Sequence, residues 1–307
     1  MITVRDIAYV RYRAPDLAAM EQFLVDFGLV TVQRSEDALY MRGAGSQPFI
    51  HVTERGAPDC LGFGLLAASE ADLRRLAGAI GNPVVSSMEP GGGQTVSLRD
   101  PAGFRVDVFY GAVPSPTIAP RAVDPVNHIT ATPRLGSGVR LQAGPSRVQR
   151  LGHLVLRVPN FAAASAYYTS MFGLRIADSY YAGDEANTVV AFMRAGLGDH
   201  YTDHHTLALV ETPQPGFDHA AFEVRDRDDL MLGHDHLVAG GYRHAWGVGR
   251  HIQGSQIFDY WRDPFGFKVE HWTDGDRIND SYPAGHRPLD PGELAQWGPP
   301  LPPDFFS

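Results

Sequence analysis

The sequence lacks the features that mark secreted, membrane-spanning and nucleic-acid-binding chains. Its one cysteine, Cys60, cannot form an intramolecular disulfide, which favours a reducing compartment. No apolar run approaches the roughly 20 residues that span a bilayer, and the N-terminus does not resemble a signal peptide. Positive charge is scarce, because 26 Lys and Arg stand against 35 Asp and Glu, giving −9. We therefore expect a cytoplasmic globular protein that binds neither membranes nor nucleic acids.

The sequence is long and is rich in turn residues and histidine. With 307 residues, it is about twice as long as a typical single domain, so two domains are expected. Its 33 Gly and 23 Pro divide the chain into many short segments, which favours strands and turns over long helices. The 13 His remain to be explained by function.

An internal repeat organises the chain. Residues 15–29 and 159–174 each start with Pro followed by Asp or Asn, continue with apolar residues at helical spacing and end in Phe-Gly-Leu. This pattern predicts a capped helix that stops at glycine. Residues 98–107 and 261–270 share an Asp-Pro-x-Gly turn followed by an alternating strand. Each half is predicted to run strand, helix, strands and then strand, helix, strands, which places the chain in the α+β class.

The repeat also predicts domain boundaries. Residues 1–111 form the N-terminal domain and residues 149–283 the C-terminal domain. Residues 112–148 are rich in Pro, Gly, Ser and Thr and are predicted to join the halves as an irregular connection. Residues 284–307 form a Pro-rich tail, which we expect to lie over the surface.

At three aligned strand positions the second half has His, His and Glu, whereas the first half has Ala, Gly and Asp. The aligned pairs are His153 with Ala8, His219 with Gly62, and Glu270 with Asp107. Two histidines and one carboxylate make up the facial triad that holds Fe(II) and leaves coordination positions open. The same ligand types also suit manganese, zinc and nickel. The sequence thus predicts a metal site in the second half alone.

Further aromatic and histidine residues lie near these positions in the sequence. Tyr260 precedes Glu270 by ten residues, and strand alternation places both side chains on one face if the turn keeps register. Candidate aromatic side chains for a pocket are Phe192, Phe258 and Trp261. Five histidines show no comparable placement and are expected to have no role in a site: His200, His234, His236, His244 and His271.

These residues resemble the vicinal oxygen chelate superfamily and, within it, the type I extradiol ring-cleavage dioxygenases. The resemblance extends from about residue 4 to residue 274. Its most specific stretch is Gly249-Arg250-His251, seven residues, Asp259-Tyr260-Trp261-Arg262-Asp263-Pro264-Phe265-Gly266, three residues and Glu270. The departures are Asp259, where the family has an apolar residue, and Gln253 and Gly254, where relatives acting on bicyclic catechols have Asn and Asp.

The resemblance implies a fold and a set of roles. Paired βαβββ modules form a half-open barrel in each domain, and the first domain is a degenerate, metal-free copy. His153, His219 and Glu270 hold Fe(II), with Mn(II) as the other candidate, and a catechol and O₂ bind opposite them. His205 acts as acid–base residue, in preference to its neighbour His204. His251 orients the substrate. Tyr260 hydrogen-bonds a substrate oxygen. The implied product is a ring opened next to the hydroxyls, in aromatic-compound degradation by a homo-oligomer.

Two other functions stay open on the sequence alone. A glyoxalase-type isomerase on the same fold needs metal ligands from both halves or from two chains, and the first half offers no matching histidine. A metal-free binding protein would not need the His, His, Glu set at all. Metal content separates the binding protein from the enzymes, and catechol-dependent O₂ uptake separates the dioxygenase from the isomerase.

Overall fold

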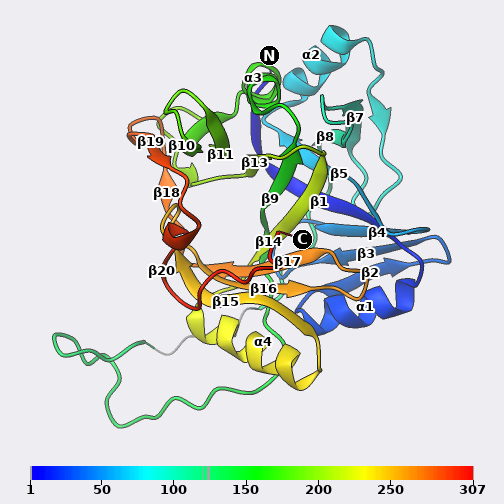
Figure 1. Cartoon of the computed structure of the whole chain (residues 1–307). Helices are drawn as coiled ribbons and strands as arrows, with labels where there is room; N and C mark the ends of the chain where they lie inside the picture. Colours follow the sequence, from blue (N-terminus) through cyan, green and yellow to red (C-terminus); the bar gives the residue numbers. More distant parts are fainter. Residues whose placement is uncertain (1, 120, 123–124, 307) are drawn as a thin grey trace.

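A computed structural model describes residues 2–119, 121–122 and 125–306, and in it the two halves of the chain form two large β-sheets (Figure 1). The first half consists of two β-α-β-β-β modules: β1 (Val4–Ala14), α1 (Leu17–Asp26), β2 (Val30–Arg34), β3 (Ala38–Arg42) and β4 (His51–Arg55), then β5 (Asp59–Ala67), α2 (Glu70–Ile80), β6 (Val85–Ser86), β7 (Gln94–Arg99) and β8 (Arg105–Tyr110). This arrangement confirms the predicted α+β class.

The second half repeats the same pattern. Its modules are β9 (Arg150–Val158), α3 (Phe161–Phe172), β10 (Arg175–Tyr181), β11 (Thr188–Arg194) and β13 (Leu207–Glu211), then β14 (Gly216–Glu223), α4 (Arg227–Ala239), β15 (Arg243–His251), β16 (Ile257–Arg262) and β17 (Lys268–Thr273). Two short strands, β12 (Thr202–Asp203) and β18 (Arg277–Ile278), pair with each other. Residues 120, 123 and 124 of the predicted connection, and residues 1 and 307, lie outside the described residues.

Both sheets are assembled in the same order. The first runs β2-β3-β4-β1-β5-β8-β7-β6, and the core of the second runs β10-β11-β13-β9-β14-β17-β16-β15. In each half the two modules meet through an antiparallel pair of first strands, β1 with β5 and β9 with β14. The closing strand of the second module lies parallel to its first strand, β8 beside β5 and β17 beside β14. As a result β9, β14 and β17 are consecutive neighbours.

The repeated helices begin and end as their sequences predict. The Asp16 side chain accepts hydrogen bonds from the backbone N–H groups of Ala18 and Ala19, and Asn160 caps α3 in the same way. Gly173 ends α3 with φ 70°, a conformation that glycine adopts without strain. No helix among the described residues is long and apolar enough to cross a bilayer.

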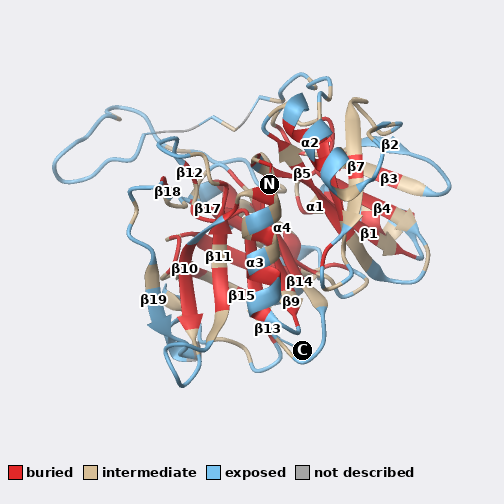
Figure 2. Cartoon of the chain, turned by 90° about the horizontal axis from the view of Figure 1, so that it is seen from above, coloured by how far each residue is buried: buried red, intermediate tan, exposed pale blue. Residues whose placement is uncertain are grey.

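The two halves pack against each other through one continuous hydrophobic core. Helices α1 and α4 lie side by side below the sheets in Figure 1, and the Tyr242 hydroxyl after α4 donates to Asp26 of α1 at 2.6 Å. Farther into the interface, His271 stacks on Phe27 with ring centroids 3.7 Å apart and donates to its carbonyl. Figure 2 shows the buried central strands and the half-exposed helices that cover them. The second sheet is therefore held rigidly on the first.

The sheet register corrects one pairing between the halves. The equivalent ladders are Tyr9–Gly64–Asp107 and His153–Ala221–Glu270. Tyr9, and not Ala8, is thus the counterpart of His153. Counting back from Phe-Gly-Leu missed by one residue, because the helical region of the second half is one residue longer. The other two predicted pairings agree with the register.

Most of the tail lies on the surface, as predicted, but it also pairs with both edges of the second sheet. Its first strand, β19 (Gly285–Pro288), pairs with β10, and its second, β20 (Ala295–Trp297), pairs with β15; the 3₁₀ helix η1 (Pro291–Glu293) lies between them. Phe305 then packs against Trp246 and Tyr260 and is 5% exposed. Exposed strand edges and an open apolar cavity give the tail partners that its proline content does not reveal.

His51 is a buried histidine that gives folding a testable pH dependence. It lies between Tyr12 and Phe222, and burial lowers its pKa to about 3. In the unfolded chain the pKa is about 6.5, so the stability contributed by neutral His51 is present above that pH and is lost as the pH falls towards 3. The loss is at most about 1.4 kcal/mol per pH unit.

We expect His51→Leu to flatten the fall of the thermal midpoint between pH 7 and pH 5, measured by calorimetry. The matched control is His200→Gln, which also removes one histidine, because His200 is exposed whereas His51 is buried. An equally steep fall in His51→Leu and the wild type would contradict this assignment.

Candidate metal centre

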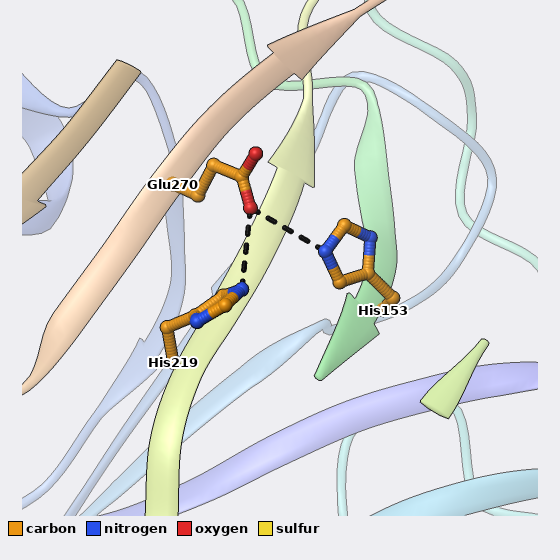
Figure 3. Close-up of side chains that lie close together, drawn as sticks. All are labelled: His153, His219 and Glu270. Carbon is orange, nitrogen blue, oxygen red and sulfur yellow. Dashed lines mark ion pairs between the residues drawn. The ribbon is translucent and has the colours of Figure 1, made fainter. Parts of the chain in front are cut away.

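Three side chains converge from the three neighbouring strands β9, β14 and β17 (Figure 3). They are His153, His219 and Glu270, and one ligand atom from each lies within 4.8 Å of the others. The Nε2 atoms of both histidines are 3.4 Å from Oε2 of Glu270. All three residues are buried, so the structure brings the predicted ligands together at the centre of the second sheet.

The carboxylate of Glu270 lacks the hydrogen bonds that a buried charge requires. It is 0% exposed, and neither oxygen has a hydrogen bond within the part of the chain that the structure describes. Burial raises the pKa of Glu270, but His153 and His219 outweigh it and hold that pKa well below its usual range. An ionised carboxylate without a partner is costly in a protein interior. Ligands about 2.1 Å from one metal ion at about 90–110° lie about 3.0–3.4 Å apart, so the donor set fits a bound metal ion.

Asp218 orients the second histidine. Its carboxylate accepts from Nδ1 of His219 at 2.7 Å and pairs with Lys268 at 2.9 Å. Burial raises the pKa of Asp218, but the His219 hydrogen bond and Lys268 lower it to about 2. With the Nδ1 proton held in this way, Nε2 of His219 is left as the acceptor that faces Glu270, as in other carboxylate–histidine–metal arrangements.

His205 lies beside the three residues and is supported by a buried chain of acceptors. Its ring is 3.9 Å from that of His153, centroid to centroid. Nδ1 of His205 is 3.1 Å from Nδ1 of His204, whose Nε2 is 2.6 Å from Asp178. If His204 donates to Asp178, it accepts the Nδ1 proton of His205, and Nε2 of His205 becomes a free base. Burial, followed by the neighbouring histidines, lowers the pKa of His205 well below its ordinary value.

Tyr260 and His251 form a second polar pair at the site. Tyr260 is directly opposite Glu270 in the β16–β17 ladder, which confirms that the two share a face. Nδ1 of His251 is 3.2 Å from the Leu294 carbonyl, and Nε2 is 2.9 Å from the Tyr260 hydroxyl. Burial lowers the pKa of His251 to about 4, and burial together with Glu270 raises the pKa of Tyr260 well above 10. At neutral pH a neutral histidine therefore accepts from a protonated tyrosine.

A cavity of about 360 Å³ opens beside these residues. Most of its lining is apolar or aromatic: Val155, Tyr180, Val190, Phe192, Ala208, Val210, Trp246, Leu289, Leu294, Phe305 and Phe306. Of the three candidate aromatics, Phe192 lines the cavity, Phe258 stacks on His251, and Trp261 faces away towards α4. The tail residues Leu289, Leu294, Phe305 and Phe306 of this lining were not predicted from the sequence.

The equivalent place in the first half has no room for a ligand set. The Tyr9 hydroxyl donates to Asp107 at 2.8 Å, so the two side chains satisfy each other. Gly62 has φ +148°, and a Cβ there would lie 1.9 Å from the carbonyl oxygen of Arg105. A histidine at position 62 would therefore require the backbone to move.

Comparisons with known proteins agree on a family. Residues 150–271 match the model of the Glyoxalase/Bleomycin resistance protein/Dioxygenase superfamily. The chain is 32% identical to metapyrocatechase 2 of Cupriavidus necator over 99% of this chain and 91% of that one. It is 27% identical to an iron-dependent extradiol dioxygenase of Rhodococcus jostii, covering 91% and 92%.

Solved structures show the same fold. Homoprotocatechuate 2,3-dioxygenase of Brevibacterium fuscum, in complex with 3,4-dihydroxyphenylacetate, superposes with a TM-score of 0.81 and 20% identity, covering 99% of this chain and 92% of that one. A Mn(II)-bound glyoxalase of Novosphingobium aromaticivorans gives 0.80 and 23%, covering 100% and 98%.

Proposed function

The chain belongs to the extradiol ring-cleavage dioxygenases of this superfamily and is a metal-dependent enzyme that opens catechol rings with O₂, and from that premise we propose that its metal is Fe(II), held by His153, His219 and Glu270. When bound, Fe(II) acidifies the catechol hydroxyls and lets electron density pass from the ring to O₂. We propose further that residues 149–283 form the catalytic domain, and that residues 1–111 are its metal-free copy.

One observation carries the proposal. The fully buried Glu270 carboxylate faces two imidazole nitrogens at 3.4 Å, has no hydrogen bond of its own, and lies beside an apolar cavity. Two imidazoles and one carboxylate on one side leave the opposite side of an ion open to substrate and O₂, and this is the ligand set of non-haem Fe(II) oxygenases.

The remaining polar residues supply proton transfer and orientation. His205 has a lowered pKa and a free Nε2, so it takes a proton from a substrate hydroxyl and returns one later in the reaction. The Tyr260 hydroxyl donates its hydrogen bond to His251, which leaves the phenolic oxygen to accept a hydrogen bond from the other substrate oxygen. Through that contact His251 acts as a positioning residue for Tyr260 as well as for the substrate.

The cavity indicates which catechols bind best. Its aliphatic and aromatic lining gives an uncharged ring substituent apolar surface to bury, whereas a carboxylated substituent loses its hydration and finds one cationic side chain in the lining, Arg157. We therefore propose a catechol with an apolar substituent as the preferred substrate, and we expect a higher kcat/KM for alkyl- or aryl-catechols than for carboxylated ones.

The glyoxalase-type isomerase has less support. That reading needs ligands from both halves or from two chains, and in the first half Tyr9 and Asp107 are bonded to each other while Gly62 has no space for a side chain. The likeness to the Mn(II)-bound glyoxalase is one of fold alone.

The test is O₂ uptake by metal-free protein reconstituted anaerobically with Fe(II), Mn(II) or Zn²⁺. We expect uptake with Fe(II), one O₂ consumed for each ring opened, and a yellow product. Higher turnover with Mn(II) would overturn the choice of iron. An absence of uptake with alkyl-, aryl- and carboxyl-substituted catechols in every metal form would overturn the proposal itself.

We also propose that the chain forms a homo-oligomer through residues 125–141 of the connection. Figure 1 shows this segment running away from both sheets. Val126, Ile129 and Leu135 in it are 72%, 102% and 80% exposed, and side chains of this kind gain from burial against another surface. Light scattering should give a mass well above 33.5 kDa, and Ile129→Asp with Leu135→Asp should lower it. A wild-type mass of one chain would contradict the proposal.

A further inference from the structure

A second group of metal-ligand residues lies on the other face of β16. Tyr260 faces the cavity, so strand alternation turns Asp259 towards α4, which covers β15 and β16 from below in Figure 1. His234 of α4 and His244 of β15 meet Asp259 there, and one ligand atom from each of the three lies within 4.8 Å of the others. Two of these residues had been expected to have no role in a site, and the third is the departure from the family pattern.

The contacts within this group resemble a coordination sphere. Nε2 of His244 is 2.8 Å from one oxygen of Asp259, and Nδ1 of His234 is 3.1 Å from the other. A tetrahedral site with bonds of about 2.0–2.1 Å has edges of about 3.3–3.4 Å, so these two spacings need to open by about 0.6 and 0.3 Å. The indole N–H of Trp261 donates to Asp259 at 2.7 Å and fixes the carboxylate, as an outer hydrogen bond does around a metal ion.

Burial and access both suit a cation. Asp259 is 0% exposed, and its ion pairs are with the two histidines. The histidine side chains are 21% and 33% exposed, which gives an ion a route from solvent and a place for a water ligand. Because the three ligands come from a helix and two strands of one rigid core, little ordering is required when an ion binds.

We propose that His234, His244 and Asp259 bind a second divalent transition-metal ion, with Zn²⁺ the best fit to two imidazoles, one carboxylate and a water molecule. The ion fastens α4 to β15 and β16, and its binding displaces the protons that the histidines now donate to Asp259. This inference does not depend on the proposed function, since it uses none of the residues at the catalytic centre.

The experiment removes metal binding at the catalytic centre by substitution and then measures how many ions the protein still binds. Chelator-treated Glu270→Gln protein is titrated with Zn²⁺ by calorimetry, and with Co²⁺, whose absorption reports nitrogen ligands. We expect Glu270→Gln to bind one equivalent of Zn²⁺ at micromolar affinity. The affinity should fall at least tenfold in Glu270→Gln/His244→Asn and should be unchanged in Glu270→Gln/His236→Gln. His244 is partly exposed, so its variant should fold even where one at Asp259 does not; His236 is on the same helix outside the cluster.

Equal Zn²⁺ binding in the His244 and His236 variants, or none in Glu270→Gln, would overturn the proposal. A failure of the catalytic centre to bind metal gives a different result. Wild-type protein and Glu270→Gln would then bind the same single equivalent, and His244→Asn would remove it from both.

Discussion

Replacing Glu270 with glutamine is expected to remove the metal and to lower kcat/KM for catechol cleavage by at least roughly a thousandfold. The amide keeps the volume of the side chain but has no charge to bind a cation, and the fully buried position offers no water in its place. The iron content of the purified protein should fall from one equivalent to near zero. His219→Ala should act in the same direction, because it removes the nitrogen that Asp218 orients.

The matched control is Asp107→Asn, since Asp107 is the counterpart of Glu270 in the first half. Its carboxylate accepts from Tyr9, so the change should lower the thermal midpoint and leave metal content and kcat/KM close to the wild type. Loss of metal in Asp107→Asn, or full metal content in Glu270→Gln, would contradict the assignment of the catalytic centre to the second half.

The sequence predicted the architecture because the fold is a duplication whose turn and cap residues are retained. Asp16 and Asn160 cap equivalent helices, and the Asp-Pro-x-Gly turns precede equivalent strands. The convergence of His153, His219 and Glu270 followed from comparing the halves, since strand positions that are equivalent in a repeat are equivalent in space. One pairing was wrong by one residue: Tyr9, and not Ala8, corresponds to His153, because the helical regions that follow them differ in length by one residue.

What could not be predicted depends on contacts between distant segments. Asp178 lies 26 residues before His204, and no local pattern indicates that β10 brings them together. Phe305 reaches the cavity only because the tail adds strands to both edges of the second sheet, although its proline content is typical of surface segments. His234, His244 and Asp259 meet across a helix and two strands, so the unusual aspartate had no visible partner in the sequence.

Replacing His205 with alanine is expected to leave the metal in place and to lower kcat by about 10²–10⁴-fold, the usual contribution of a positioned acid–base residue. The cavity contains His205, whereas His204 is directed away from it towards Asp178. Turnover and metal content should be measured together, because His153 is a neighbour of His205 and a displaced ligand would imitate a lost base.

His204→Gln is the companion variant, and its expected loss in kcat is smaller, about tenfold, with a change in the pH profile. The substitution replaces an imidazole that Asp178 orients with an amide that presents either its oxygen or its NH₂ group to Nδ1 of His205, so the tautomer that leaves Nε2 free is less strongly favoured. Asp178→Asn should alter the pH profile in the same way, because it acts through His204. Wild-type turnover in His205→Ala together with an inactive His204→Gln would show that the roles of the two histidines are reversed.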